Sequence, residues 1–184
     1  MAKLSDDAKA ERRDAIVTAA TVRFASQGFH ATSMAEVISD SGLAAGTVYK
    51  YFASKDDLIV ATAERALNGI GAAVASLVGR ESIPSPSEFL DAVRASLPSD
   101  PSGTLRAHLV LHSWAETSRN PQLAELVCDR YEKLMAAVGP LINVWQERGE
   151  LPHDRDSAES GRLLLALIQG QIVQAAIFGS RQQH

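Results

Sequence analysis

The chain has 184 residues, a formal net charge of -4, and 46% hydrophobic against 22% charged residues. These values fit a soluble globular protein with a sizeable core and exclude a nucleic-acid binder that relies on bulk positive charge. The N-terminus lacks the apolar core of a signal peptide, and no apolar run approaches the about 18 residues of a membrane span. Cys128 is the only cysteine, so no intrachain disulfide can form, and we expect a cytoplasmic protein.

The sequence predicts an all-α protein, because alternating strand patterns and Asn-Gly or Asp-Gly hairpin signals are both missing. Eight or nine helices are expected, the number depending on whether Gly139-Pro140 interrupts the seventh. Their expected ranges are 7–27, 33–41, 45–52, 54–78, 86–97, 104–119, 121–148 and 156–178.

Helix-end signals are clearest in the first 60 residues. Gly28 is placed to cap the first helix in a left-handed conformation. Ser33 and Glu36 form a Ser-x-x-Glu capping box at the start of the second helix, and Gly42 follows its end. Ser54 is the expected N-cap of the fourth helix. The interval from Gly79 to Pro86 carries glycine, serine and two prolines, which marks a candidate domain boundary.

Residues 32–52 predict a helix, a tight turn and a second helix, the arrangement of a helix-turn-helix. Residues 42–55 contain two lysines and no acid, although residues 1–60 together are close to neutral. The small and polar side chains expected to reach base edges are Ala45, Gly46, Thr47 and Lys50. Those expected to hold phosphates are Thr32, Ser33, Tyr49, Tyr51 and Lys55. The competing interpretation is that the aromatic cluster serves only for packing, as Val48 and Phe52 must.

This part of the chain resembles the DNA-binding domain of the TetR family of transcriptional regulators. The matching positions of the first two helices are Ile16, Ala19, Ala20, Phe24, Gly28, Phe29, Thr32, Ser33, Ile38 and Gly42. The closing pattern Gly-Thr-x-Tyr-x-Tyr-Phe-x-Ser-Lys-x-x-Leu is matched from Gly46 to Leu58. Ala44 departs from the serine that usually caps the recognition helix, and Asp40-Ser41 replaces a usual pair of small residues.

The resemblance implies a homodimeric, ligand-responsive regulator, with operator DNA and a small, largely apolar effector as partners. It divides the chain into a DNA-binding domain (7–55) and a C-terminal ligand-binding and dimerisation domain (56–184). Repression released by the effector is the family habit. The last two long helices are implied to dimerise, and the final helix is indeed apolar around most of its circumference. The expected interface residues are Leu164, Leu167, Ile168, Gln171, Ile172 and Ala175.

Residues typical of ligand pockets gather on the middle helices. They are Phe89, His108, His112, Trp114, Tyr131, Met135 and Trp145. Because His108, His112 and Glu116 recur every four residues, they share one helix face. This face is expected to be a pocket wall, a metal site or plain surface. A helical small-molecule binder without DNA binding and a metal-dependent enzyme using the two histidines are the rival functions. No nucleophile-base set, glycine-rich phosphate loop or paired carboxylates support catalysis, so no catalytic residue, cofactor or metal is assigned.

Overall fold

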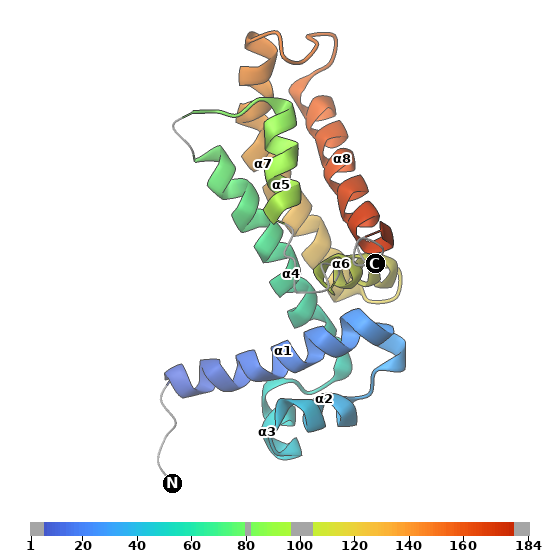
Figure 1. Cartoon of the computed structure of the whole chain (residues 1–184). Coiled ribbons are helices and arrows are strands. Elements are labelled where there is room, and N and C mark those ends of the chain that lie inside the picture. The colour runs from blue at the N-terminus through green and yellow to red at the C-terminus, as the bar shows by residue number, and fades with distance from the viewer. Residues whose placement is uncertain (1–5, 80–81, 97–104, 179–184) are drawn as a thin grey trace.

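The computed structural model describes residues 6–79, 82–96 and 105–178. Helices are the only regular elements in these ranges, which confirms the predicted all-α class. The helices are α1 (Asp6–Ala31), α2 (Met34–Ser41), α3 (Ala45–Tyr51), α4 (Lys55–Val78), α5 (Pro86–Ser96), α6 (Leu105–Glu116), α7 (Pro121–Glu147) and α8 (Ser157–Phe178). Figure 1 shows α1, α2 and α3 as a small group at one end and α5 to α8 gathered at the other.

The small N-terminal group is built around apolar side chains from each of its helices. Ile16, Phe24, Val37, Val48 and Phe52 are all buried there. The predicted capping box forms at the start of α2, and Ser54 caps α4 as predicted, with Asp57 completing a second capping box. These N-caps begin each helix at a defined residue. Burial of the apolar side chains then holds the helices of this group together.

Gly28 makes the predicted break in α1, but in a different way from a simple helix end. Its φ of 82° is positive as expected, while its ψ of 167° leaves the left-handed helical region. One further helical turn, to Ala31, follows the break, so the first helical element extends past the predicted end at residue 27. Gly42 does adopt the predicted left-handed cap, with φ 66° and ψ 12°.

α4 connects the two groups of helices. It packs on α1 near its N-terminus and on α7 along its remaining length, and it is continuous from Lys55 to Val78. α4 ends at Val78 and α5 begins at Pro86, yet these two helices pack on each other at the end of the molecule away from α3. The Gly/Pro-rich interval is therefore a connection within one body and not a boundary between two.

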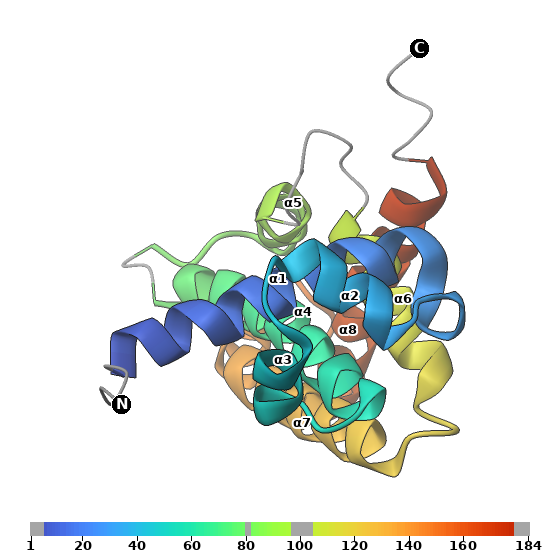
Figure 2. The same cartoon turned by 90° about the horizontal axis from the view of Figure 1, so that it is seen from below.

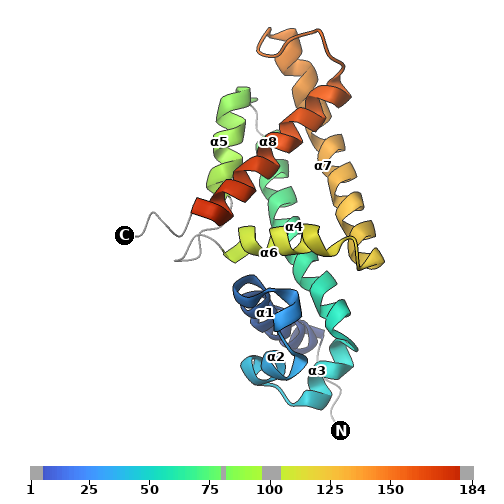
Figure 3. The ribbon, with the colours of Figure 1, turned by 90° about the vertical axis from the view of Figure 1, so that its right-hand side faces the viewer.

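The upper group consists of α4, α5, α7 and α8 running side by side, with α6 crossing beneath them (Figure 3). α6 packs on α1 as well as on α4 and α8, so it forms a floor between the upper body and the N-terminal group. Phe89 and Trp145 meet edge to face in the core, with ring centroids 5.5 Å apart. α7 continues through Pro140, so the count is eight helices over the described residues, not nine.

α4 and α8 are long and apolar enough, by composition, to cross a membrane, which the sequence analysis did not expect. Half of the apolar stretch of α4 is buried inside the protein, as suits a core helix. Only 28% of the corresponding stretch of α8 is buried. The apolar surface of α8 is thus an unusual feature of an isolated protomer.

Candidate DNA interface and internal cavity

α3 lies at the end of the molecule farthest from the upper helices, and Figure 2 shows it on the surface when seen from below. Ala45, Gly46, Tyr49 and Lys50 are exposed on it, while Val48 is fully buried and anchors the helix. A Cβ atom added at Gly46 would meet nothing within 4 Å. The exposed side of α3 is therefore small and open at its start and polar in its second turn.

The start of α3 carries no side-chain cap. Ala44 has the extended backbone of an N-cap residue (φ -63°, ψ 142°), but no side chain accepts a hydrogen bond from the first turn. Only the Ala44 carbonyl does so, from the N–H groups of Thr47 (2.8 Å) and Val48 (3.2 Å). A missing cap hydroxyl costs a helix about 1 kcal/mol. Burial of Val48 and Phe52 holds this seven-residue helix in place instead.

Two residues expected to hold phosphates have their polar groups committed inside the protein. Thr32 is only 1% exposed, and its hydroxyl donates to the Gly28 carbonyl at 3.0 Å. The Lys55 ammonium donates to the carbonyl oxygens of Phe29 (3.0 Å) and Thr32 (3.2 Å). These contacts satisfy carbonyls at the end of α1 and tie them to the start of α4. Sequence spacing could not reveal the contacts of Lys55, because its two partners lie 26 and 23 positions away.

The other expected phosphate and base contacts differ in exposure. Tyr49 is 49% exposed, and Lys50 is exposed and takes part in no ion pair among the described residues. Thr47 and Tyr51 are half-buried, and Tyr51 packs against the core. The Ser33 hydroxyl accepts from the Glu36 N–H and donates to the Glu36 carboxylate at 2.8 Å. Tyr49 and Lys50 are thus the freest polar side chains of the set.

The acids near α2 are largely paired, which weakens their repulsion of a phosphate backbone. Arg23 donates to both carboxylate oxygens of Asp40 and lies 3.7 Å from Glu36. The Arg23 hydrogen bond lowers the pKa of Asp40, and hydrogen bonds from the Ser33 backbone and hydroxyl lower that of Glu36. The fold accommodates Asp40 where the family usually has a small residue, because Asp40 lies at the surface and is paired with Arg23.

Arg13 is a further cation near α3 that was not predicted as a DNA contact. Its guanidinium carbon lies 5.4 Å from the ring centroid of Phe52, the residue that ends α3. The side chain is exposed, so it adds a positive charge beside α3. The signal available in the sequence was only the Arg12-Arg13 pair, and its register relative to α3 depends on the tertiary packing.

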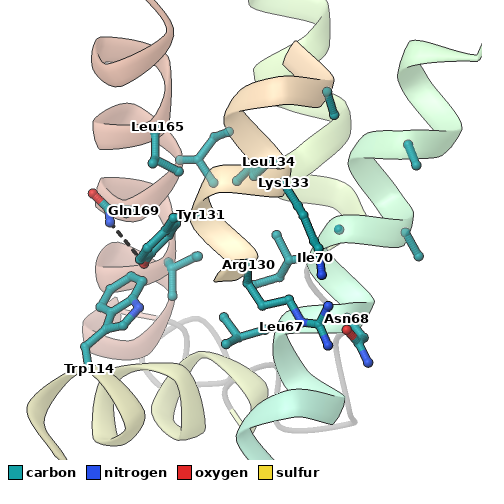
Figure 4. Close-up of a pocket in the computed structure, with 16 residues that line it drawn as sticks. Leu67, Asn68, Ile70, Trp114, Arg130, Tyr131, Lys133, Leu134, Leu165 and Gln169 are labelled. Carbon is teal, nitrogen blue, oxygen red and sulfur yellow. Dashed lines mark hydrogen bonds between the residues drawn. The ribbon is translucent and has the colours of Figure 1, made fainter. Parts of the chain in front are cut away.

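A cavity of about 420 Å³ lies between α4, α6, α7 and α8 (Figure 4). Its walls are mostly aliphatic, with Leu67 and Ile70 from α4, Leu134 from α7 and Ile168 from α8. Trp114 of α6 and Tyr131 of α7 line it as predicted. This volume falls in the range of natural small-molecule sites.

The other five residues expected in the pocket do not line this cavity. Phe89 and Trp145 pack against each other in the core, and the side chain of Met135 packs against Gly161 of α8. His108 forms a 3.0 Å hydrogen bond between its Nε2 atom and the Ala176 carbonyl. His112 lies outside the cavity, where α6 meets α1.

The face of α6 predicted to carry His108, His112 and Glu116 splits into separate contacts. The His112 ring contacts the Phe29 ring, with ring centroids 5.9 Å apart. The Glu116 carboxylate lies 3.0 Å from the Nε2 atom of His30. No group of three or more potential metal ligands occurs within the described residues. The three residues therefore do not assemble one site: His112 and Glu116 contact α1, whereas His108 contacts α8.

α8 presents an apolar outer face. Leu167 is 56% exposed, and Leu163, Ile177 and Phe178 are similarly exposed. Of the expected interface residues, only Leu167 is exposed, and Gln171 and Ala175 are half-buried. The remaining ones face the core of their own chain; they are Leu164, Ile168 and Ile172.

Two family descriptions match the chain. Residues 16–62 match "Bacterial regulatory proteins, tetR family", and residues 88–183 match "BetI-type transcriptional repressor, C-terminal". The chain is 30% identical over 163 residues to the HTH-type transcriptional regulator UidR of Escherichia coli K12, covering 86% of this chain and 78% of UidR.

Solved structures agree over nearly the whole chain. Salmonella enterica GusR has a TM-score of 0.74 and 28% identity, covering 97% of this chain and 90% of GusR. A transcriptional regulator from Saccharomonospora viridis, in complex with choline, has a TM-score of 0.72 and 27% identity, covering 90% and 85% of the two chains.

Proposed function

Because the chain belongs to the TetR family of transcriptional regulators, and is a DNA-binding regulator and not an enzyme, we propose that it is a homodimeric repressor released from its operator by a small effector. Its DNA-binding domain comprises residues 7–55 and its ligand-binding and dimerisation domain residues 56–184. It acts in the cytoplasm, where its operator is. The observation that carries the proposal is the exposure of Gly46, Tyr49 and Lys50 on a short surface helix.

α3 is the reading helix of the proposed complex. Ala45 and Gly46 let its N-terminal turn approach base edges closely, while Thr47 and Lys50 reach along the major groove. Tyr49 and Arg13, exposed on either side, contact phosphates, and backbone N–H groups at the start of α2 can do the same beside Ser33. Lys55 and Thr32 position the reading helix from within, through their contacts at the end of α1.

Dimerisation is assigned to the outer face of α8 together with α7. A solvent-exposed stripe of large apolar side chains is costly on a monomer and is typical of a subunit interface. Two reading heads are also required by an operator of two half-sites about one helical turn apart. Leu167 is central to this interface, and Leu163 and Ile177 extend it.

The effector would occupy the cavity between α4, α6, α7 and α8. Two of its walls, α4 and α6, also pack on α1, so a change in cavity shape reaches the DNA-binding domain directly. Release requires that the effector binds more tightly to a conformation whose two α3 helices no longer match the half-sites.

The proposal is tested by fluorescence anisotropy with labelled duplexes from the region upstream of the gene. The wild-type protein should bind one of them specifically, with an affinity that falls as salt rises. Lys50→Ala should weaken binding about tenfold, because it removes a contact to a base or phosphate. Arg94→Ala, which removes an exposed cation of α5, is the matched control and should bind as the wild type does.

Unchanged affinity of Lys50→Ala would contradict the assignment of α3 as the reading helix. Failure of the wild-type protein to bind any of the duplexes in a salt-dependent way would favour the rival function, a helical small-molecule binder without DNA binding.

A further inference from the structure

The polar groups lining the cavity between α4, α6, α7 and α8 are mostly hydrogen-bond donors. Arg130 and Lys133 line the cavity, and none of the described residues that line it is an aspartate or a glutamate. Trp114 and Tyr131 add an indole N–H and a phenol, and the only side-chain amides are those of Asn68 and Gln169. Such a lining is complementary to a ligand that accepts hydrogen bonds.

At the α8 side of the cavity, the Trp114 indole N–H and the Tyr131 phenol hydrogen are available to a ligand. Figure 4 shows Trp114, Tyr131 and Gln169 grouped there. Gln169 donates its amide N–H to the Tyr131 oxygen at 3.0 Å, which leaves the phenol hydrogen free for an acceptor. The Trp114 Nε1 atom is buried beside this phenol and makes no hydrogen bond of good geometry within the described part of the chain.

The Tyr131 phenol stays a donor at ordinary pH. Burial raises its pKa, and the neighbouring Gln169 and Trp114 donors only partly offset that effect. A buried donor without a partner costs free energy comparable to a lost hydrogen bond. An acceptor oxygen placed between the indole N–H and the phenol would remove that cost.

The α4 side of the cavity carries positive charge. Arg130 donates to Glu64 at 3.0 Å, and Lys133 donates to Asp129 at 2.8 Å. Both acids lie outside the cavity lining, and the Arg130 Nε atom is buried without a hydrogen-bond partner among the described residues. The two carboxylates thus pair with both cations, and the cavity lining itself offers no carboxylate that could pair with a cationic ligand.

Aliphatic side chains separate the two polar sides. Leu67, Ile70, Leu134, Leu165 and Ile168 line the space between them. They favour an apolar ligand body through burial of its surface.

We propose that the effector is an apolar compound bearing an acceptor oxygen, such as a carboxylate, which binds at Trp114 and Tyr131 with its apolar body along α4 and α7. This inference rests on the proposed function for the statement that the ligand regulates DNA binding. It also separates this chain from its relative that was solved with choline, because a quaternary ammonium group carries no acceptor for the Trp114 and Tyr131 donors.

The test is isothermal titration of the full chain, without DNA, with two probes of equal chain length and opposite head-group charge. Octanoate should bind saturably, and at least about tenfold more tightly than octyltrimethylammonium, because only octanoate supplies an acceptor. Tyr131→Phe and Trp114→Phe keep an aromatic ring and remove one donor each, so each should weaken octanoate binding about tenfold. Ser76→Ala, which removes an exposed hydroxyl of α4 outside the cavity lining, is the control and should leave octanoate binding unchanged.

Absence of saturable octanoate binding, equal or tighter binding of the ammonium probe, or unchanged octanoate affinity of both cavity variants would overturn the proposed ligand chemistry. None of these results bears on DNA binding, which the anisotropy measurement tests separately. Conversely, a protein that binds octanoate as expected but binds no duplex would retain the ligand chemistry and lose the regulatory function.

Discussion

Gly28 and His112 form the residue-level contact between the DNA-binding part of the chain and α6. At Gly28 the backbone has a positive φ of 82°, and a Cβ atom added there would lie 3.5 Å from the His112 ring. The glycine is thus required by backbone conformation and not by lack of space. The same imidazole also contacts the Phe29 ring at a tilt of 57°, so His112 packs against the break in α1.

His112 lowers the free energy of unfolding as the pH falls. Burial, and then the neighbouring His108, lower the pKa of His112 below its ordinary value of 6.5. The unfolded chain therefore binds a proton more readily than the folded one, so this contribution is complete above pH 6.5 and is lost as pH falls below it. Urea unfolding over this pH range should show a shallower loss of stability for His112→Gln than for the wild type. An equal effect from His153→Gln, at an exposed position, would refute the assignment to His112.

At the scale of elements, the helices with strong local signals were predictable and the role of each exposed face was not. The capping boxes at Ser33 and Ser54 act over three residues, so the sequence alone located the starts of α2 and α4. The extra turn of α1 after Gly28 depends instead on packing of Phe29, which contacts Phe24 of the same helix and His112 of the distant α6.

α8 shows the same limit. Its apolar composition was evident, but its core-facing and outward-facing residues could not be told apart, because apolar side chains occur on nearly every side. Only the packing of α8 on α5, α6 and α7 shows that Leu164 and Ile168 face inward while Leu167 faces outward.

The dimer assignment follows from that outward face. Leu167→Glu places a charge where a partner subunit would bury an apolar side chain, and an unpaired charge there costs several kcal/mol. Because Leu167 is 56% exposed in the protomer, the protomer itself should lose little stability. Sedimentation velocity should show a wild-type dimer and a folded Leu167→Glu monomer. Val22→Glu alters a comparably exposed apolar residue on α1 and should remain dimeric. A dimeric Leu167→Glu protein would exclude this face as the interface.

At the scale of the whole molecule, the sequence was sufficient for the fold class and the position of α3, and insufficient for the cavity. The motif from Gly46 to Leu58 is local, and it lies where the structure places α3 and the start of α4. The cavity is lined from four helices, so its members meet only after packing, and five of the seven expected residues lie elsewhere. The contacts of Lys55 were not predictable for the same reason, since its carbonyl partners are far away in sequence.

The central claim is that the exposed side of α3 makes close contact with DNA, and Gly46 tests it most directly. A methyl group at this position meets nothing within 4 Å, and replacing glycine by alanine in a helix adds about 0.5 kcal/mol of stability. Gly46→Ala should therefore unfold at a slightly higher urea concentration, yet bind operator DNA about tenfold more weakly, because the methyl group prevents close approach. Higher stability with unchanged DNA affinity would contradict the claim.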